Sequence, residues 1–347
     1  MRALPLEAKV QMSINRIRAF YNEKDCYISF SGGKDSTVLL HIIRTHMPSY
    51  DIPAVFNNVS TQYRELKEFV ENYEPNAIIL NPAKSFVEVC RDEGFPLVSK
   101  DVAEVVSSAK KHMQNNLHVT LSELESDPEK WAEILRSGKI KGANKAVARM
   151  MGWKTKDGTI TCHTDRSNRS CYTHTKYKWL LEAPFDLSHR CCHIMKKAPL
   201  AQYTKETGRY PITGELAEES NLRLVSWHLH GCNTFGNKPK SKPLSFWTEQ
   251  DILEYLYTNN VPIAKCYGKI VKGEDGKYRT TLCERTGCIT CGFGCYQKGD
   301  QRYKLLKEEF PEMYNLLDVC KNNGYTMRQA IEWMNAHHPY GKQIEGV

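Results

Sequence analysis

The fold is decided by the stretch CYISFSGGKDSTVLLHII, which spans residues 26–43. Its first five residues form a short run that is rich in aromatic and β-branched residues, and this run predicts a buried strand. Its last seven residues, from Thr37 to Ile43, are mostly apolar and predict a helix packed on a sheet. The loop Ser-Gly-Gly-Lys-Asp-Ser, residues 31–36, connects the two. The stretch therefore predicts a strand, a glycine loop and a helix in direct succession.

The flanking sequence extends this unit into a parallel sheet. Helical spacing of apolar residues predicts helices near 10–20 and at 62–73, and short apolar runs predict strands at 52–56, 77–80 and 211–214. This β-α-β-α-β order predicts an α/β fold, with a parallel twisted sheet flanked by helices. In such folds ligands bind at the carboxyl ends of the strands.

The sequence predicts two domains. We expect a nucleotide-binding domain over 1–260, with a mostly helical, basic insert at about 100–180. A Cys-rich segment with C-terminal helices, at about 300–320 and 326–337, is expected to occupy 261–347. Two capped helix starts are predicted locally, at Asp127-Pro128 and at Thr248, with Asp251 as partner. The alternating His228 and His230 suggest a strand.

Composition narrows the class of protein. The 347 residues include 48 basic and 40 acidic ones, and the net charge of +8 favours anionic ligands such as nucleotides. The chain lacks a run of eighteen apolar residues and its start lacks a signal peptide's apolar core, so no membrane contact and a cytoplasmic location are expected. In a reducing compartment, 13 cysteines indicate metal binding or catalysis rather than disulfides.

The glycine loop has the chemistry of an anion site. Gly32 and Gly33 allow a tight turn and close approach to a ligand. Successive N–H groups at a helix N-terminus attract phosphate, and Ser31, Ser36 and Lys34 add hydroxyl groups and a positive charge. The pattern differs from the Walker loop, G-x-x-x-x-G-K-[ST]. It predicts a phosphate site of another kind.

Four cysteines near the C-terminal end have the spacing of a metal loop. They follow the pattern Cys283-x4-Cys288-x2-Cys291-x3-Cys295, with glycines between them. Zinc takes four such thiolates, and so does an iron–sulfur cluster, which also accepts ligands far apart in sequence. Spacing alone leaves both metals open.

The hexapeptide 31–36 resembles the loop of the ATP-pyrophosphatase (PP-loop) superfamily, whose fold is adenine nucleotide α-hydrolase-like. Members bind ATP or an adenylyl-sulfate and act at the α-phosphate. Residues 190–200, 213–223 and 243–252 resemble segments of the sulfonucleotide (APS/PAPS) reductases. That likeness implies a 4Fe-4S cluster on Cys191, Cys192, Cys288 and Cys291, with Cys283 or Cys295 as substitutes and zinc as the alternative metal.

The resemblance also implies site residues. Lys34, Asp35 and Ser36 are expected to be catalytic, with Mg²⁺ beside them. The residues expected to bind the nucleotide are Ser31, Gly32, Gly33, Lys34, Asp35, Ser36, Asn57, Asn58, Lys100, Gly214, Glu215 and Arg223. For some of these a structural interpretation stays open: a strand-end turn for Asn57 and Asn58, and an exposed helix start for Lys100.

The reaction is less determined than the site. Reductases of this kind carry a thiol in a tail that reads Glu-Cys-Gly-x-His, a motif that does not follow Cys320, the last cysteine here. We therefore favour ATP pyrophosphatase chemistry coupled to sulfur transfer, as in the similar DndC-like proteins and tRNA thiolases. Sulfonucleotide reduction is the alternative if Cys295 or Cys320 supplies the thiol, and a non-catalytic nucleotide or redox sensor is another.

Partners are suggested by charge and by the reaction. The basic insert, with Trp153 among its lysines, is a candidate surface for a nucleic acid acceptor. Sulfur transfer also implies a sulfur donor protein. The sequence predicts no oligomeric state.

Overall fold

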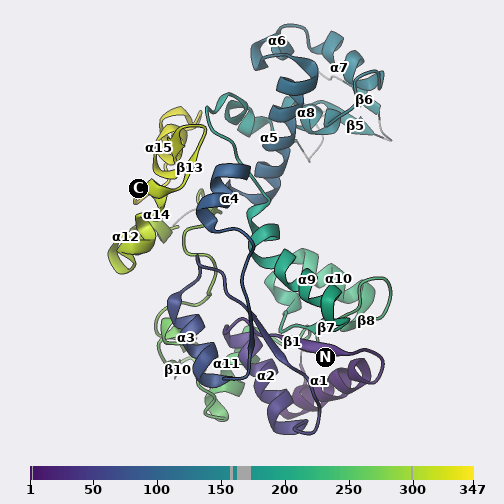
Figure 1. Ribbon diagram of the computed structural model, residues 1–347, viewed down its shortest axis with the longest axis vertical. Helices are drawn as coiled ribbons and strands as arrows, with labels where there is room; N and C mark the ends of the chain where they lie inside the picture. The colour runs from purple at the N-terminus through teal and green to yellow at the C-terminus, as the bar shows by residue number, and fades with distance from the viewer. Residues whose placement is uncertain (2, 157–158, 162–172, 298–299) are drawn as a thin grey trace. The chain divides into compact units, whose positions relative to one another are not determined.

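The computed structural model describes all residues except 2, 157–158, 162–172 and 298–299. It divides into two compact units (Figure 1). Unit 1 comprises residues 1–83 and 195–288, and unit 2 comprises 84–194 and 289–347. These units are defined by packing, and the expected division of the chain at residue 260 stays a prediction.

Unit 1 is built on a six-stranded sheet in the order β3-β2-β1-β7-β9-β8. Its strands are β1 Cys26–Ser29, β2 Ala54–Asn57, β3 Ile78–Leu80, β7 Tyr210–Ile212, β8 Asn233–Thr234 and β9 Lys240–Ser241. All neighbours pair in parallel except β8 and β9, and Ile28 of β1 pairs with Ala54 on one side and Ile212 on the other. The predicted α/β fold with a mostly parallel sheet is confirmed.

Helices cover this sheet through apolar faces. The longer ones are α1 Leu6–Tyr21, α2 Lys34–His46, α3 Arg64–Tyr73, α9 Ala198–Thr207, α10 Asn221–His230 and α11 Glu249–Thr258. Short elements complete the unit: η5 Ala217–Glu219, η6 Lys265–Tyr267, β10 Ile270–Lys272 and β11 Tyr278–Thr280. The main core joins α1, α2 and α11 to β1, and Val38, Leu39 and Ile42 of α2 are fully buried within it. This burial explains why the apolar run after the glycine loop forms a helix.

A buried ion pair links the first helix of unit 1 to its last long one. The Nζ of Lys9 lies 2.6 Å from Oδ2 of Asp251, and the Lys9 side chain is almost completely buried. Asp251 also accepts the backbone N–H of Thr248, as the predicted capping box requires. One carboxylate thus both caps α11 and fixes it to α1.

Unit 2 is mainly helical. Its first part contains α4 Phe86–Glu93, β4 Leu97–Val98, α5 Lys100–His112, η1 Met113–Leu117, α6 Leu121–Ser126, α7 Pro128–Arg136, α8 Asn144–Met151, β5 Lys154–Lys156, β6 Thr159–Thr161 and η3 Thr175–Glu182. Its second part contains β12 Gly292–Phe293, α12 Arg302–Glu309, α13 Pro311–Tyr314, α14 Leu316–Val319, β13 Lys321–Asn322, β14 Tyr325–Thr326 and α15 Met327–His337. The π-helical turn η4, His193–Lys197, lies where the chain passes from unit 2 to unit 1.

The described part of the insert is mostly helical, as expected, and it also contains the antiparallel strands β5 and β6. Two other local expectations were wrong. The helical stretch expected at about 300–320 is three short helices, because the residue before Pro311 cannot keep a helical backbone. His228 and His230 end helix α10 and do not alternate along a strand. The capped start at Asp127 and Pro128 is confirmed.

Among the residues that the structure describes, no helix combines the length and apolar character needed to cross a lipid bilayer.

We expect Lys9→Met to lower the free energy of unfolding by about 3 kcal/mol, because it leaves the Asp251 carboxylate without its cation. Chemical denaturation measures this. The control is Lys67→Met, which breaks the exposed ion pair with Glu71 and should change stability by less than about 0.5 kcal/mol. Equal effects of the two substitutions would show that the buried pair does not hold α1 to α11.

Candidate functional site

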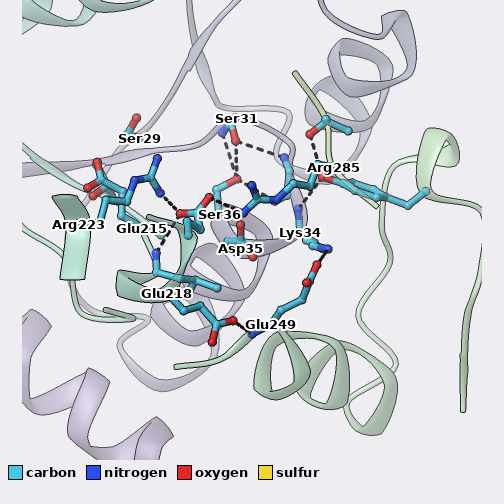
Figure 2. Close-up of a pocket in the computed structure, with 17 residues that line it drawn as sticks. Ser29, Ser31, Lys34, Asp35, Ser36, Glu215, Glu218, Arg223, Glu249 and Arg285 are labelled. Atoms are coloured by element: carbon cyan, nitrogen blue, oxygen red, sulfur yellow. Dashed lines mark hydrogen bonds and ion pairs between the residues drawn. The ribbon is translucent and has the colours of Figure 1, made fainter. Parts of the chain in front are cut away.

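The candidate site lies where the order of the sheet changes direction. From β1 the chain proceeds to β2 and β3 on one side, whereas β7 and β9 lie on the other. The loops that follow β1 and β7 therefore meet at the carboxyl end of the sheet, the usual ligand position in such folds. A pocket of unit 1 lies there (Figure 2), lined by Ser29, Ser31, Gly33, Lys34, Asp35, Ser36, Thr213, Gly214, Glu215, Leu216, Glu218, Glu219, Arg223, Glu249, Tyr267, Arg285 and Thr286.

The loop after β1 is held closed by its own hydroxyl groups. The Oγ atoms of Ser31 and Ser36 lie 3.0 Å apart, and the Ser36 hydroxyl donates to the carbonyl of Gly33 at 2.9 Å. Gly32 has a φ of +71°, which a residue with a side chain adopts rarely. Helix α2 starts at Lys34, so its first N–H groups, which have no intrahelical partner, face this loop.

The loop after β7 comes unusually close to the first turn of α2. A Cβ atom placed on Gly214 would lie 2.8 Å from the carbonyl oxygen of Asp35. Only glycine fits at that distance, because the neighbouring atoms are backbone. Gly214 therefore closes one wall of the pocket directly against the loop.

The pocket holds three cations, and the described contacts pair each with glutamate. Lys34 forms an ion pair with Glu249 and donates to the carbonyl oxygen of Glu284 at 2.7 Å. Arg223 pairs with Glu219, and Arg285 lies 3.2 Å from the same carboxylate. Figure 2 shows these side chains converging on the space beside the loop. An entering phosphate chain would compete with carboxylates for the cations, or share a metal ion with them.

The Asp35 carboxylate takes no part in these described ion pairs. Its Oδ1 atom is buried and has no hydrogen-bond partner among the described residues. Burial raises the pKa of its carboxyl to about 6; the charge of Lys34 lowers it and that of Glu249 raises it further. A carboxyl that titrates near neutral pH in a pocket can accept a proton from a reactant.

The structure places most of the predicted nucleotide residues in this pocket. Ser31, Gly33, Lys34, Asp35, Ser36, Gly214, Glu215 and Arg223 line it. Gly32 lies behind the loop, against the backbone of Leu66. Their predicted roles are not tested by this placement.

Three predicted residues lie elsewhere. Asn57 donates to the carbonyl oxygens of Met195 and Lys196, at 2.8 and 3.2 Å. Asn58 donates to Asn81 at 3.0 Å. Lys100 is exposed at the first position of α5, in unit 2. None of the three lines the pocket, so their assignment to the nucleotide stays a prediction.

Several pocket residues were missed by the sequence reasoning. Tyr267 accepts the backbone N–H of Lys34 at 3.3 Å through its hydroxyl, which also lies 2.8 Å from Thr286 Oγ1. Glu249 is the first residue of the predicted helix α11, and Arg285 lies inside the Cys-rich spacing. These residues are far from the loop 31–36 in sequence, so only the folded structure shows that they line the pocket.

The described residues do not fit a metal centre as they stand. No group of three or more His, Cys, Asp or Glu side chains within them is placed to hold a metal ion. Cys283 and Cys288 belong to unit 1, whereas Cys191, Cys192, Cys291 and Cys295 belong to unit 2. Cys162 and Cys171 lie outside the described residues. The 4Fe-4S and zinc assignments therefore stay predictions.

The thiols differ in reactivity. Cys320 is fully buried in unit 2 and hydrogen-bonded to Cys90, and burial raises the pKa of Cys295 to about 11. The Cys320 thiol is therefore not accessible, and the raised pKa of Cys295 disfavours its thiolate. Cys283 in unit 1 is only half-buried, and a hydrogen bond with Cys266, followed by the charge of Lys34, lowers the pKa of its thiol. Of these thiols, Cys283 alone combines access with a lowered pKa.

Comparisons with known proteins show the family of this chain. The family model of the phosphoadenosine phosphosulfate reductase domain matches residues 25–96 and 156–292. An adenosine 5'-phosphosulfate reductase from Burkholderia cepacia is 33% identical over 78 residues, which are 22% of this chain and 30% of that protein. The match thus spans about a third of the relative's length. A crystal structure of phosphoadenylyl-sulfate (PAPS) reductase from Candida auris, a phosphate complex, matches 76% of this chain and 91% of its own, at 12% identity and a TM-score of 0.35.

We expect the free energy of unfolding to fall as pH rises from about 4 to about 6, by roughly 2–3 kcal/mol from Asp35 alone. The sign follows from the raised pKa: in that range the folded protein binds more protons than the unfolded chain. Asp35→Asn should remove this slope in denaturation curves recorded across the range. The exposed control Asp25→Asn should retain it, and an unchanged slope in Asp35→Asn would contradict the assignment.

Proposed function

Because the chain belongs to the phosphoadenosine phosphosulfate reductase domain family, whose model matches more than half of it, we propose that it is an enzyme acting on ATP or an adenylyl-sulfate. The observation that carries the proposal is the closed loop 31–36 at the start of α2, with cations and a buried carboxyl around it. Phosphate oxygens are the ligands that such a helix N-terminus attracts.

In this proposal, the phosphate chain lies on the loop and replaces Glu249 as the partner of Lys34. Arg223 and Arg285 provide two more positive charges at the other wall of the pocket. Both arginines contact Glu219 in the free protein, so a bound polyanion would replace Glu219 as their partner. Three cations around one pocket suit a triphosphate, or the phosphate and sulfate of an adenylyl-sulfate.

We favour cleavage of ATP between its α- and β-phosphates, coupled to sulfur transfer. An acceptor oxygen would attack the α-phosphorus, pyrophosphate would leave, and sulfur would then displace AMP from the acceptor. Lys34 and the loop N–H groups stabilise the charge that develops on pyrophosphate, and Ser36 orients the loop. Asp35 Oδ1, which accepts no hydrogen bond from the described part of the chain, would receive the proton of the attacking group.

The carboxylates of the pocket support ATP as the nucleotide. Glu215, Glu218, Glu219 and Glu249 all line it, and oxygen ligands are those that Mg²⁺ prefers. A Mg²⁺ ion held by the phosphate oxygens and one or two of these carboxylates would neutralise charge on the leaving pyrophosphate. Glu215 pairs with Lys240, whose charge helps to keep the pKa of the Glu215 carboxyl low despite burial.

Sulfonucleotide reduction is the second candidate. It is favoured by the family itself and by the relative from Burkholderia cepacia, which is an adenosine 5'-phosphosulfate reductase. In that reaction a thiol attacks the sulfur of APS, AMP leaves, and the thiol carries the sulfite group. A second thiol, from a dithiol protein such as thioredoxin, then attacks the first sulfur, releases sulfite and forms a disulfide. The same loop and cations would hold the nucleotide, so the products distinguish the two reactions. A sensor without turnover would form neither product.

The proposed acceptor is a nucleic acid bound at the basic insert, with a sulfur donor protein as the other partner. Lys139, Lys141 and Lys145 are exposed there, which suits contacts with phosphates. Trp153 is buried, so it does not offer a ring for base stacking as the sequence suggested. Arg149 lies against Asp101.

We expect the protein to release pyrophosphate from Mg²⁺-ATP when an RNA or DNA acceptor is present, and no sulfite from APS or PAPS with thioredoxin. Lys34→Ala should weaken ATP binding about 10- to 100-fold in calorimetry, since charge-assisted hydrogen bonds contribute about 1.5–3 kcal/mol each. Lys205→Ala, an exposed lysine of α9, is the control and should bind normally. Sulfite without pyrophosphate would replace the favoured reaction by the reductase.

We also propose the 4Fe-4S cluster on Cys191, Cys192, Cys288 and Cys291, with Cys283 and Cys295 as substitutes and zinc as alternative. The tandem pair Cys191-Cys192 and the C-x-x-C spacing of Cys288 and Cys291 support it.

Anaerobically purified protein is expected to hold about four irons per chain. Cys288→Ser and Cys291→Ser should each abolish the brown absorbance, and Cys232→Ser, at a buried thiol of the core of unit 1, should keep it. One equivalent of zinc in a colourless protein would refute the cluster.

A further inference from the structure

Two thiols lie in contact beside the phosphate loop. Cys266 belongs to the short helix η6, and Cys283 follows β11 on the returning strand of the same hairpin. The backbone N–H of Cys283 donates to the carbonyl of Cys266 at 3.2 Å, and that of Leu282 donates to Tyr267 at 3.1 Å. The two side chains are hydrogen-bonded to each other and pack in one small apolar cluster. All these residues belong to unit 1.

Each thiol is one residue away from a group that holds Lys34. Tyr267, next to Cys266, accepts the backbone N–H of Lys34, and its ring lies 5.9 Å from the Lys34 ammonium. Glu284, next to Cys283, accepts from that ammonium at 2.7 Å through its carbonyl oxygen. The two arms are also joined by the 2.8 Å contact between Tyr267 and Thr286. The thiol pair therefore lies at the base of the clamp formed by Tyr267 and Glu284 around Lys34.

We propose that Cys266 and Cys283 are a redox modification site, at which a reversible disulfide locks this clamp and weakens nucleotide binding. The regulatory part rests on the nucleotide site proposed above. The hydrogen bond between the two thiols and the backbone hydrogen bond between Cys283 and Cys266 hold the two side chains together, so a disulfide can form after a small local shift. Cys283 is the half-buried member of the pair and Cys266 is buried, which makes Cys283 the point of entry for an oxidant.

The chemistry balances with a small disulfide as the oxidant. The Cys283 thiolate attacks one sulfur of oxidised glutathione, forms a mixed disulfide and releases one glutathione thiolate. The Cys266 sulfur then attacks Sγ of Cys283, the mixed disulfide breaks, and the second glutathione leaves. The two protons of the protein thiols pass to the two glutathione molecules. Two electrons thus move from the cysteine pair to glutathione, and a dithiol reductant reverses the process.

The bond would act on binding through Lys34. A disulfide draws two sulfurs from contact to about 2.05 Å, and it ties the residues on both sides of the ammonium. Lys34 then keeps its contact with the Glu284 carbonyl and cannot follow the phosphate chain. We expect ATP affinity to fall about tenfold on oxidation, the loss of about one charge-assisted hydrogen bond.

The test uses the full chain, kept anaerobic, in glutathione buffers from fully reduced to fully oxidised. Free thiols are alkylated, linked peptides are mapped by mass spectrometry, and ATP binding is measured on the same samples. The variants are Cys266→Ala and Cys283→Ala, checked for folding by thermal melting. The matched control is Cys232→Ala, which removes a buried thiol in the main core of unit 1.

The expected result is a Cys266–Cys283 linked peptide in the natural protein and in Cys232→Ala. Its formation should weaken ATP binding about tenfold, dithiothreitol should restore it, and Cys266→Ala should bind ATP equally in all buffers. Full alkylation of both thiols in oxidised glutathione, or a link from Cys283 to another cysteine, would overturn the site. A link that leaves affinity unchanged would overturn the regulation. A linked peptide in a protein whose reduced form binds no nucleotide would instead refute the proposed function and leave the disulfide standing.

Discussion

The structure of the site depends on one close approach, between Gly214 after β7 and the first turn of α2. A side chain at that position would meet the Asp35 carbonyl at 2.8 Å, so the two loops can close only over a glycine. The approach exists because β7 pairs directly with β1, with Ile212 beside Ile28. Parallel pairing of β1 and β7, at the point where the strand order reverses, thus brings two segments far apart in sequence together as one wall of the pocket. The phosphate loop gains a fixed shape before any ligand arrives.

Ion pairs position the charged side chains of the pocket. In the free protein Lys34 is held by Glu249, and Glu219 serves both arginines of the pocket, so the cations are positioned by carboxylates rather than left in water. Such pairs keep long side chains in place at little cost, and a nucleotide can replace the carboxylates. Asp35 is different, because its Oδ1 atom accepts no hydrogen bond from the described residues and burial raises the pKa of its carboxyl to about 6. One pocket thus brings together three cations and a buried carboxyl that titrates near neutral pH.

Local sequence chemistry predicted the centre of the fold well. The strand, loop and helix over 26–43, and the helix capped by Thr248, depend on neighbours in sequence, and both are present as expected. The residues that the sequence missed, such as Tyr267 and Arg285, depend on a hairpin returning to the loop over a long separation. The spacing of the cysteines could not show that Cys283 contacts Cys266, because the same spacing is compatible with a metal-binding loop and with a pair of thiols. For the same reason the metal prediction was not settled by pattern.

The central claim is that the loop 31–36 receives the phosphate chain of an adenine nucleotide. Hydrogen–deuterium exchange of the backbone amides, with and without Mg²⁺-ATP, tests it most directly. The loop N–H groups and those of the first turn of α2 have no intrahelical acceptor, so bound phosphate oxygens should slow their exchange. The account predicts protection at 31–36 and in the segment around Gly214, at the same nucleotide concentration. Unchanged exchange in both segments, with protection elsewhere in the chain, would contradict it.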